Sequence, residues 1–412
     1  MFQLARHAGF VIVFLWWAFW LAMHNSQFSG VIIADGYYQL NFVVMLLGML
    51  VGYLASLYVR PVILPRSYVC SVEGGVGAFR MCVRPFMLFF VLFVCAVAIL
   101  VSGKMSGMFD LGFREYFGRV RGGGGDAVGT YVTGYSFLDY GLKLFVYPSL
   151  MALFLVCILF VGGKLQKWSL LMTTLLIFLF SYLYQVNYPF IFIFFAVLFS
   201  VHVRKLMGDP CKGCLLKLVV TLLLVFGVIF SAAVNRYGVA DVGGVVTYYF
   251  VNYHTLGFYL YQVGVERVSG EMFTLGRSIA GPVELYFSKI AEYCFGLGFE
   301  SAYAANLSAS AEAVVAMKDG RYSNAFVTAL FSFYRDFGLL GIALGGIFYG
   351  ALLGALQGRQ GFWGAIYLFV LVLGMLSIYA SPFEQPYLWL TPIVIWLLLR
   401  KLRAPAARRD FI

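Results

Sequence analysis

Long apolar runs separated by short polar segments dominate this chain. A helix needs about 20 mostly apolar residues to cross the hydrocarbon core of a membrane. Ten stretches meet or approach that length, so the pattern predicts about ten transmembrane helices. The stretches are residues 9–25, 41–59, 86–103, 142–162, 168–185, 190–203, 218–234, 337–356, 362–380 and 387–399.

Composition indicates that these runs face lipid and do not form the core of a soluble protein. Of the 412 residues, 62% are hydrophobic and 11% are charged, whereas a soluble domain carries about 25% charged residues. So few charges cannot cover a surface that faces water. We therefore expect an all-α polytopic membrane protein. The composition excludes soluble enzymes, nucleic-acid binders and disordered scaffolds.

The basic residues are distributed unevenly over the segments between the runs. With the N-terminus in the cytoplasm, the cytoplasmic segments hold 17 of the 29 Lys and Arg residues but only three of the 18 acidic residues. Cytoplasmic loops of membrane proteins carry such an excess of positive charge. The bias predicts that both termini are cytoplasmic. The net charge of +11 then reflects orientation and does not point to an acidic partner.

This topology leaves two long external segments, residues 104–140 and residues 235–336, in which we expect short helices. The longest cytoplasmic loop, residues 60–85, is too short for the folded domain of roughly 50–200 residues that a nucleotide-using machine needs. The chain also has no Gly-Lys-Ser/Thr phosphate loop and no His-Glu-x-x-His zinc pair. We expect one membrane domain over residues 1–412, without metal or cofactor. Its substrate would arrive already activated, as a lipid-linked intermediate.

A transporter or flippase is the alternative class of protein. Those proteins bury ionisable residues at mid-membrane and often contain broken helices. The deep parts of the ten runs are almost free of charge. The pattern therefore gives this class little support.

The cysteines give only a weak metal signal. Cys211 and Cys214 form a Cys-x-x-Cys pair that, together with Cys70 and Cys82, has the residues of a four-thiolate zinc site. Unpaired thiols in short cytoplasmic loops are the favoured interpretation. Only Cys294 is expected outside, so no external disulfide framework is predicted.

Three arginines lie in the first external segment, within a predicted amphipathic helix over residues 110–121. One interpretation is a surface helix with ion pairs four residues apart, such as Asp110 with Arg114. In the other, Arg114 and Arg121 share a face at the height of the lipid headgroups, where arginine binds phosphate bidentately. Both interpretations stay open, and Arg114 is a candidate ligand for a diphosphate.

The second external segment combines arginines with tyrosines. Arg236 and Arg277 are further candidates for binding a diphosphate. Tyr249 and Tyr253 offer ring faces and hydroxyls to sugars, although an interfacial belt of aromatic residues explains any single tyrosine better.

The second external segment also contains candidates for a general base. His254 is its one histidine, and histidine titrates near neutral pH, which suits proton transfer. A structural hydrogen bond is at least as good an explanation of this histidine. The alternative bases, which the sequence does not rank, are the carboxylates Glu266, Glu271, Glu284, Glu300 and Asp319.

An Arg-Asp pair stands at the predicted entrance to the eighth run. Charges at that depth are costly unless they lie at the interface or face a polar cavity. An internal ion pair between Arg335 and Asp336 that caps the membrane helix is an equally weighted alternative.

The residues around this pair resemble a known family. The pattern Asn-x-x-x-Thr … Tyr-x-Asp-Phe-Gly-x-x-Gly looks like one found in the Wzy-type O-antigen and oligosaccharide repeat-unit polymerases. It consists of Asn324, Thr328, Tyr334, Asp336, Gly338 and Gly341. The stretch 270–284, with Phe273, Thr274 and Arg277, is similar to the region that precedes this pattern in the family. The resemblance implies a GT-C-like membrane fold, shared with O-antigen ligases.

The resemblance also implies an activity on the periplasmic face of a bacterial inner membrane. A glycan carried by undecaprenyl diphosphate passes en bloc to the terminal hydroxyl of an incoming lipid-linked repeat unit, and lipid diphosphate leaves. Membrane lipid and a chain-length-regulating co-polymerase are the other partners implied. An O-antigen ligase, or a flippase or transporter of lipid-linked oligosaccharide, is the alternative function.

Each candidate residue has a role in this scheme. Arginines would neutralise the negative charge that develops on the leaving diphosphate. Cations that are already in position and shielded from bulk water stabilise such charge most strongly. The diphosphate candidates are Arg114, Arg236, Arg277 and Arg335. The candidates for binding the glycan are Tyr249, Tyr253, Asn324 and Tyr334. His254 is the first choice for the catalytic proton acceptor and Asp336 is the second.

Overall fold

The structure is a computed structural model of the full chain. The residues that it describes are 2–26, 28, 30–63, 83–121, 132–160, 163–186, 188–208, 227, 243, 246–299, 301–302, 305–306, 309, 315–316, 322–323, 328–378, 380–385 and 387–399.

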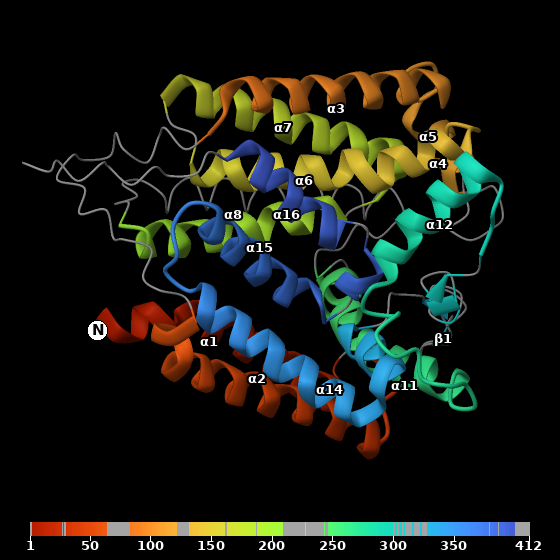
Figure 1. Ribbon diagram of the computed structural model, residues 1–412. Helices are drawn as coiled ribbons and strands as arrows, with labels where there is room; N and C mark the ends of the chain where they lie inside the picture. The colour runs from red at the N-terminus through yellow and green to blue at the C-terminus, as the bar shows by residue number, and fades with distance from the viewer. Residues whose placement is uncertain are drawn as a thin grey trace, which may run out of the picture.

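Apolar helices lie roughly side by side and form a bundle (Figure 1). Among the described residues, seven helical segments are long and apolar enough to cross a membrane. They belong to α1 (Phe2–Asn25), α2 (Gly36–Ile63), α3 (Pro85–Met105), the continuous α5 (Ser136–Gly141), η2 (Leu142–Val146) and α6 (Tyr147–Leu159), α7 (Gly163–Tyr184), α8 (Tyr188–Leu206) and α14 (Ala329–Leu356). Two shorter apolar helices follow, α15 (Phe362–Leu376) and α16 (Tyr387–Leu398).

These helices confirm the prediction of an all-α polytopic membrane protein. Nine of the ten predicted runs coincide with helices of the structure. The seventh run, residues 218–234, lies outside the described residues. The cysteines of the possible zinc site also lie outside them, whereas Cys294 is described and is an exposed free cysteine.

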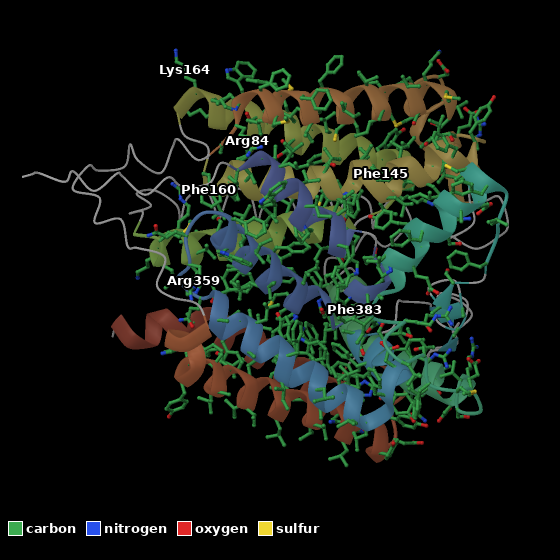
Figure 2. The ribbon with its side chains drawn as sticks, in the orientation of Figure 1. Arg84, Phe145, Phe160, Lys164, Arg359 and Phe383 are labelled. Carbon is green, nitrogen blue, oxygen red and sulfur yellow. The ribbon has the colours of Figure 1, made fainter. Side chains whose placement is uncertain are left out.

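Three of the basic residues predicted to be cytoplasmic lie at one end of the bundle. Figure 2 shows Arg84, Lys164 and Arg359 at the same end as the N-terminus. The predicted orientation, with both termini in the cytoplasm, stays a prediction. We call the opposite end, where α1 ends at Asn25 and α2 begins at Gly36, the far end.

Glycines allow α2 and α14 to pack backbone to backbone. These two helices form the most extensive helix pair in the described part of the chain and run parallel to each other. A Cβ on Gly52 would overlap the backbone carbonyl of Ile347, and one on Gly350 would overlap that of Met49. Such close approach between membrane helices gains dispersion energy that larger residues would prevent.

A break divides α14 just after Asp336. Phe337 has φ −147° and ψ 21°, and Gly338 has φ 60° and ψ −143°, a conformation that is open to glycine alone. The chain turns so sharply that a Cβ on Gly341 would overlap the carbonyl of Phe333. The predicted run, residues 337–356, therefore coincides with the part of α14 after the break, and a helical part that begins at Ala329 precedes it.

Short helices lie in the two segments predicted to be external. Residues 104–140 contain α4 (Phe113–Arg121), and residues 235–336 contain η3 (Val246–Asn252), α11 (Tyr253–Arg267) and α12 (Gly281–Phe295). The second segment also holds a two-residue antiparallel pair, β1 (Val315–Ala316) and β2 (Tyr322–Ser323), and η4 (Pro382–Glu384) follows α15. In Figure 1, α4, α11 and α12 all lie toward the far end.

The helix predicted over residues 110–121 is shorter than expected. It begins at Phe113, and Asp110 lies in the turn before it. The Asp110 carboxylate accepts a hydrogen bond from Lys104 Nζ at 2.9 Å. Tyr116 on α4 is fully buried and donates to the backbone carbonyl of Leu183 at 2.7 Å. Burial raises the pKa of Tyr116 to about 12, so this hydroxyl remains a neutral donor.

A methyl group at Gly52 tests the packing of α2 against α14. We expect Gly52→Ala to destabilise the protein by about 1–3 kcal/mol because the methyl group displaces the Ile347 backbone. The control is Gly141→Ala, on a helix where a Cβ meets nothing within 4 Å. Thermal unfolding of the detergent-purified variants checks both, and an equal midpoint for Gly52→Ala and Gly141→Ala would refute the packing argument.

Candidate functional site

Three consecutive residues before the break in α14 enter three different groups of contacts. Tyr334 faces a cluster of tyrosines, Arg335 faces Glu271, and Asp336 faces the loop that precedes α12. All three lie at the far end of the bundle, because α14 begins there in parallel with α2. The structure thus brings together two predicted sites, one in the middle of the second external segment and one at its end.

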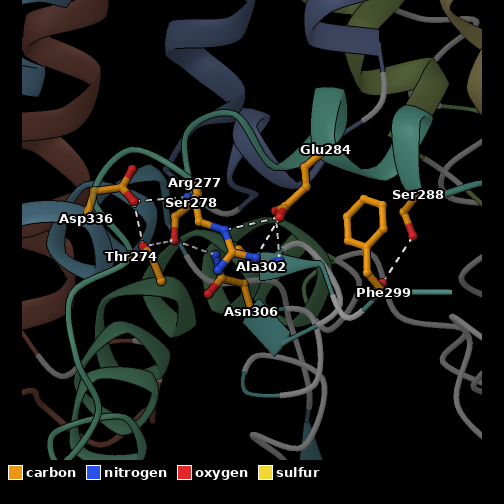
Figure 3. A network of polar contacts seen from close by, with 9 residues as sticks. All are labelled: Thr274, Arg277, Ser278, Glu284, Ser288, Phe299, Ala302, Asn306 and Asp336. Atoms are coloured by element: carbon orange, nitrogen blue, oxygen red, sulfur yellow. Dashed lines mark hydrogen bonds and ion pairs between the residues drawn. The ribbon is translucent and has the colours of Figure 1, made fainter. Parts of the chain in front are cut away.

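Asp336 is fully buried and holds the loop before α12 through both carboxylate oxygens (Figure 3). Oδ1 accepts from the Thr274 hydroxyl at 2.5 Å and from the Ser278 backbone N–H at 2.9 Å. Oδ2 accepts from the Ile279 backbone N–H at 2.9 Å. This geometry makes Asp336 the anchor of residues 274–279, and its predicted role as a proton acceptor stays a prediction.

Arg335 pairs with Glu271 and not with its neighbour Asp336. Its side chain is 6% exposed, and Nη2 donates to Glu271 Oε2 at 2.7 Å. Nε donates to Asn306 Oδ1 at 3.2 Å. The alternative of an internal Arg335–Asp336 ion pair is therefore wrong. A buried guanidinium needs such partners, because an uncompensated buried charge is strongly destabilising.

A directed chain of hydrogen bonds links Arg335 to Asp336. Asn306 Nδ2 donates to Ser278 Oγ at 2.8 Å, and Ser278 Oγ lies 2.7 Å from Thr274 Oγ1. An amide nitrogen only donates and a carboxylate only accepts, so Ser278 donates to Thr274 and Thr274 donates to Asp336. Bonds aligned in one direction polarise each other, which strengthens the chain.

Arg277 lies on the same loop but is turned outward. Its side chain is 57% exposed, and Nε and Nη2 both donate to Glu284 Oε1, at 3.1 and 2.6 Å. The other oxygen of Glu284 accepts from the Ala302 backbone N–H at 2.8 Å. Glu284 therefore fixes the direction of the Arg277 guanidinium while leaving much of it open to the outside.

The tyrosine cluster joins α14 to the start of α2. Tyr334 lies close to Tyr37, and its ring centroid lies 6.3 Å from that of Tyr261. The ring of Tyr38 lies 5.3 Å from that of Tyr37 and 6.1 Å from that of Tyr261. Tyr37 is exposed, whereas Tyr261 is fully buried and accepts a hydrogen bond from Asn41 at 2.9 Å. Burial raises the pKa of Tyr261, so its hydroxyl stays protonated.

Two carboxylates border the tyrosine cluster. Gln262 Nε2 donates to Asp35 Oδ2 at 3.0 Å and to Glu266 Oε1 at 2.8 Å. Glu266 also lies close to Tyr38. The sequence analysis did not single out Asp35, Tyr37 or Tyr38. The available signal was an Asp-Gly-Tyr-Tyr run in the short segment predicted to join the first two membrane helices on the external side.

His254 lies away from this site, among aromatic rings of α1. It is buried, with its ring stacked on Trp20 at 4.4 Å and edge-on to Trp16 at 5.2 Å. None of the hydrogen bonds described above for Asp336 involves it. Its predicted catalytic role stays a prediction.

The other candidates are only partly placed. Tyr253 begins α11 and is half-buried. Arg114 lies on α4 and Tyr249 on η3, and their side chains are not among those described. Arg236 and Asn324 lie outside the described residues. Within the part of the chain that the structure describes, no group of three His, Cys, Asp or Glu side chains is arranged to hold a metal ion.

Comparisons of this chain with protein-family models, with curated proteins and with solved structures find no match.

Removing one hydroxyl tests the directed hydrogen-bond chain. We expect Ser278→Ala to cost about 1–3 kcal/mol of stability, because the buried Asn306 amide and Thr274 hydroxyl each lose a partner. Ser288→Ala is the matched control, since that buried serine makes one described bond, to the carbonyl of Phe299 at 3.2 Å. Thermal unfolding midpoints compare the two variants, and a loss no greater for Ser278→Ala than for Ser288→Ala would contradict the chain.

Proposed function

We propose that this chain joins lipid-linked oligosaccharide repeat units into a surface polysaccharide, as a GT-C-like, Wzy-type polymerase. The observation that carries the proposal is the division of contacts at Tyr334, Arg335 and Asp336. Tyr334 belongs to the tyrosine cluster, whose rings and hydroxyls suit sugars. Asp336 anchors the loop that carries Arg277, whose guanidinium suits a diphosphate. Both lie at one end of a membrane bundle, where a lipid-linked substrate presents its headgroup.

Arg277 is the proposed ligand for the leaving diphosphate. A guanidinium forms bidentate hydrogen bonds to phosphate oxygens. Arg277 is exposed and held in direction by Glu284, so its orientation is set before substrate binds. Arg335 is buried against Glu271 and Asn306 and acts on the site by holding the loop that carries Arg277.

The tyrosine cluster is the proposed contact with the glycan. Tyrosine rings stack on the apolar faces of sugars, and their hydroxyls bond to sugar hydroxyls. Tyr334 was a candidate from the sequence, and the structure adds Tyr37 and Tyr38 beside it. Asp35 and Glu266 add carboxylate oxygens that accept hydrogen bonds from sugar hydroxyls.

The reaction requires one proton acceptor. The acceptor hydroxyl loses its proton as its oxygen bonds to the anomeric carbon of the donor, and lipid diphosphate leaves with the electrons of the broken C–O bond. Glu271 and Glu284 are paired with arginines, and Asp336 is held by three donors. The neighbours described for Glu266, which are Gln262 and Tyr38, are neutral. We therefore propose Glu266 as the proton acceptor and keep His254 as the alternative.

The alternatives from the sequence remain an O-antigen ligase and a flippase or transporter. A ligase uses the same donor but passes the finished chain to a different acceptor. A transporter would move the lipid-linked oligosaccharide without breaking the glycosidic bond to diphosphate.

Variants of Arg277 and its partner test the proposed phosphate contact. We expect Arg277→Ala to reduce chain extension in cells roughly 100-fold or more, which is typical of losing one preorganised donor to a developing negative charge. Arg277→Lys keeps the charge without the fork and should recover only part of this activity. The length of the surface polysaccharide on a gel measures each variant against its expression level.

Glu284→Gln is the control for the ion pair itself. It removes the negative charge but keeps the guanidinium and a side-chain oxygen that accepts a hydrogen bond from it, so we expect a much smaller loss of chain extension than in Arg277→Ala. Equal loss of extension in Arg277→Ala and Glu284→Gln would show that the ion pair is structural and would contradict phosphate binding by Arg277.

A further inference from the structure

Large apolar side chains are exposed on the loop that Asp336 anchors. Met272 is 89% exposed, Phe273 55% and Leu275 72%. We call residues 272–275 the apolar lip. Arg277 follows it directly and is also exposed. An exposed apolar group of this kind on a loop marks a surface that meets a partner or a membrane.

The apolar lip lies against the end of a membrane helix. A Cβ on Gly338 would lie 3.1 Å from Phe273 Cζ, so the ring of Phe273 covers Gly338 at the break in α14. The residues that follow the break, Leu339 and Leu340, are exposed and apolar and begin the lipid-facing side of α14. The lip therefore continues the lipid-facing surface of this helix beyond its far end.

The lip is held rigidly in this exposed position. Thr274 bonds to Asp336 within the lip, and the Ser278 and Ile279 N–H groups bond to Asp336 just beyond it. Between these anchors, Leu275 has φ 51°, a left-handed conformation that is unfavourable for leucine. Such strain persists only where the surrounding structure enforces it, and it is found at binding surfaces. Here it keeps a leucine turned outward.

We propose that the apolar lip inserts into the bilayer at the boundary between hydrocarbon and headgroups. The occupant of this surface is therefore the hydrocarbon of membrane lipids. Its contact with the lipid-facing side of α14 favours this occupant over a soluble partner or a second copy of the chain. Arg277 then lies at the height of the lipid phosphates, with which its charge is complementary. This proposal does not depend on the polymerase activity.

A tryptophan in the lip measures whether lipid surrounds it. The full chain carrying Met272→Trp is reconstituted into phosphatidylcholine vesicles, with or without bromine on the acyl chains, and the wild-type emission is subtracted. We expect the added fluorescence to be quenched by the brominated lipid and protected from acrylamide in the water. Leu275→Trp is measured in the same way, in case the first variant folds poorly.

Two results would overturn insertion. Quenching by acrylamide without quenching by brominated lipid would show that the lip faces water. Protection from both quenchers would show that protein covers it, as a second copy of the chain would.

A matched pair at Leu275 tests whether its apolar character causes the insertion. Leu275→Asn keeps the left-handed backbone, which asparagine tolerates, but removes the apolar side chain. In the Met272→Trp background we expect it to lower quenching by brominated lipid by roughly half or more, whereas Leu275→Met should leave quenching unchanged. Equal quenching in Leu275→Asn and Leu275→Met would contradict the role of Leu275.

Discussion

The break in α14 is the constraint on which the arrangement of the far end depends. Gly338 supplies a backbone conformation that only glycine adopts readily, and Gly341 lets the chain pass close to Phe333. After the break, the helix packs along α2 through close glycine contacts. Before it, Arg335 and Asp336 remain at the end of the bundle, where partners from the second external segment reach them. In a straight helix, Arg335 and Asp336 would continue the membrane-spanning part of α14. They would then be charged groups without the partners that the break lets them reach.

The sequence predicted the membrane helices well because apolar length is a direct requirement of the bilayer. Nine of the ten predicted runs are helical in the structure. The predicted start of the eighth run agrees with the break at Phe337 and Gly338. The helical part before the break was not predicted, because Arg335 and Asp336 interrupt the apolar run. Asp110 was likewise placed on a helix, but it lies in the turn before α4 and pairs with Lys104.

The contacts of the candidate site could not be predicted from spacing along the chain. Thr274, Ser278, Asn306 and Asp336 are joined by hydrogen bonds across about 60 residues of sequence. From the sequence, both Arg277 and Arg335 were candidates for binding the diphosphate. In the structure, Arg335 is buried in a supporting ion pair, whereas the Arg277 guanidinium is directed outward. Tyr37 was overlooked because it lies in a short segment far from the motif that drew attention to Tyr334.

Deleting the gene in its host and separating the lipopolysaccharide on a gel tests the proposed function most directly. The polymerase proposal predicts lipopolysaccharide that carries one repeat unit, with no ladder of longer chains, because the first unit is still delivered and attached. Loss of every repeat, including the first, would contradict the proposal, because that result requires a ligase or a flippase.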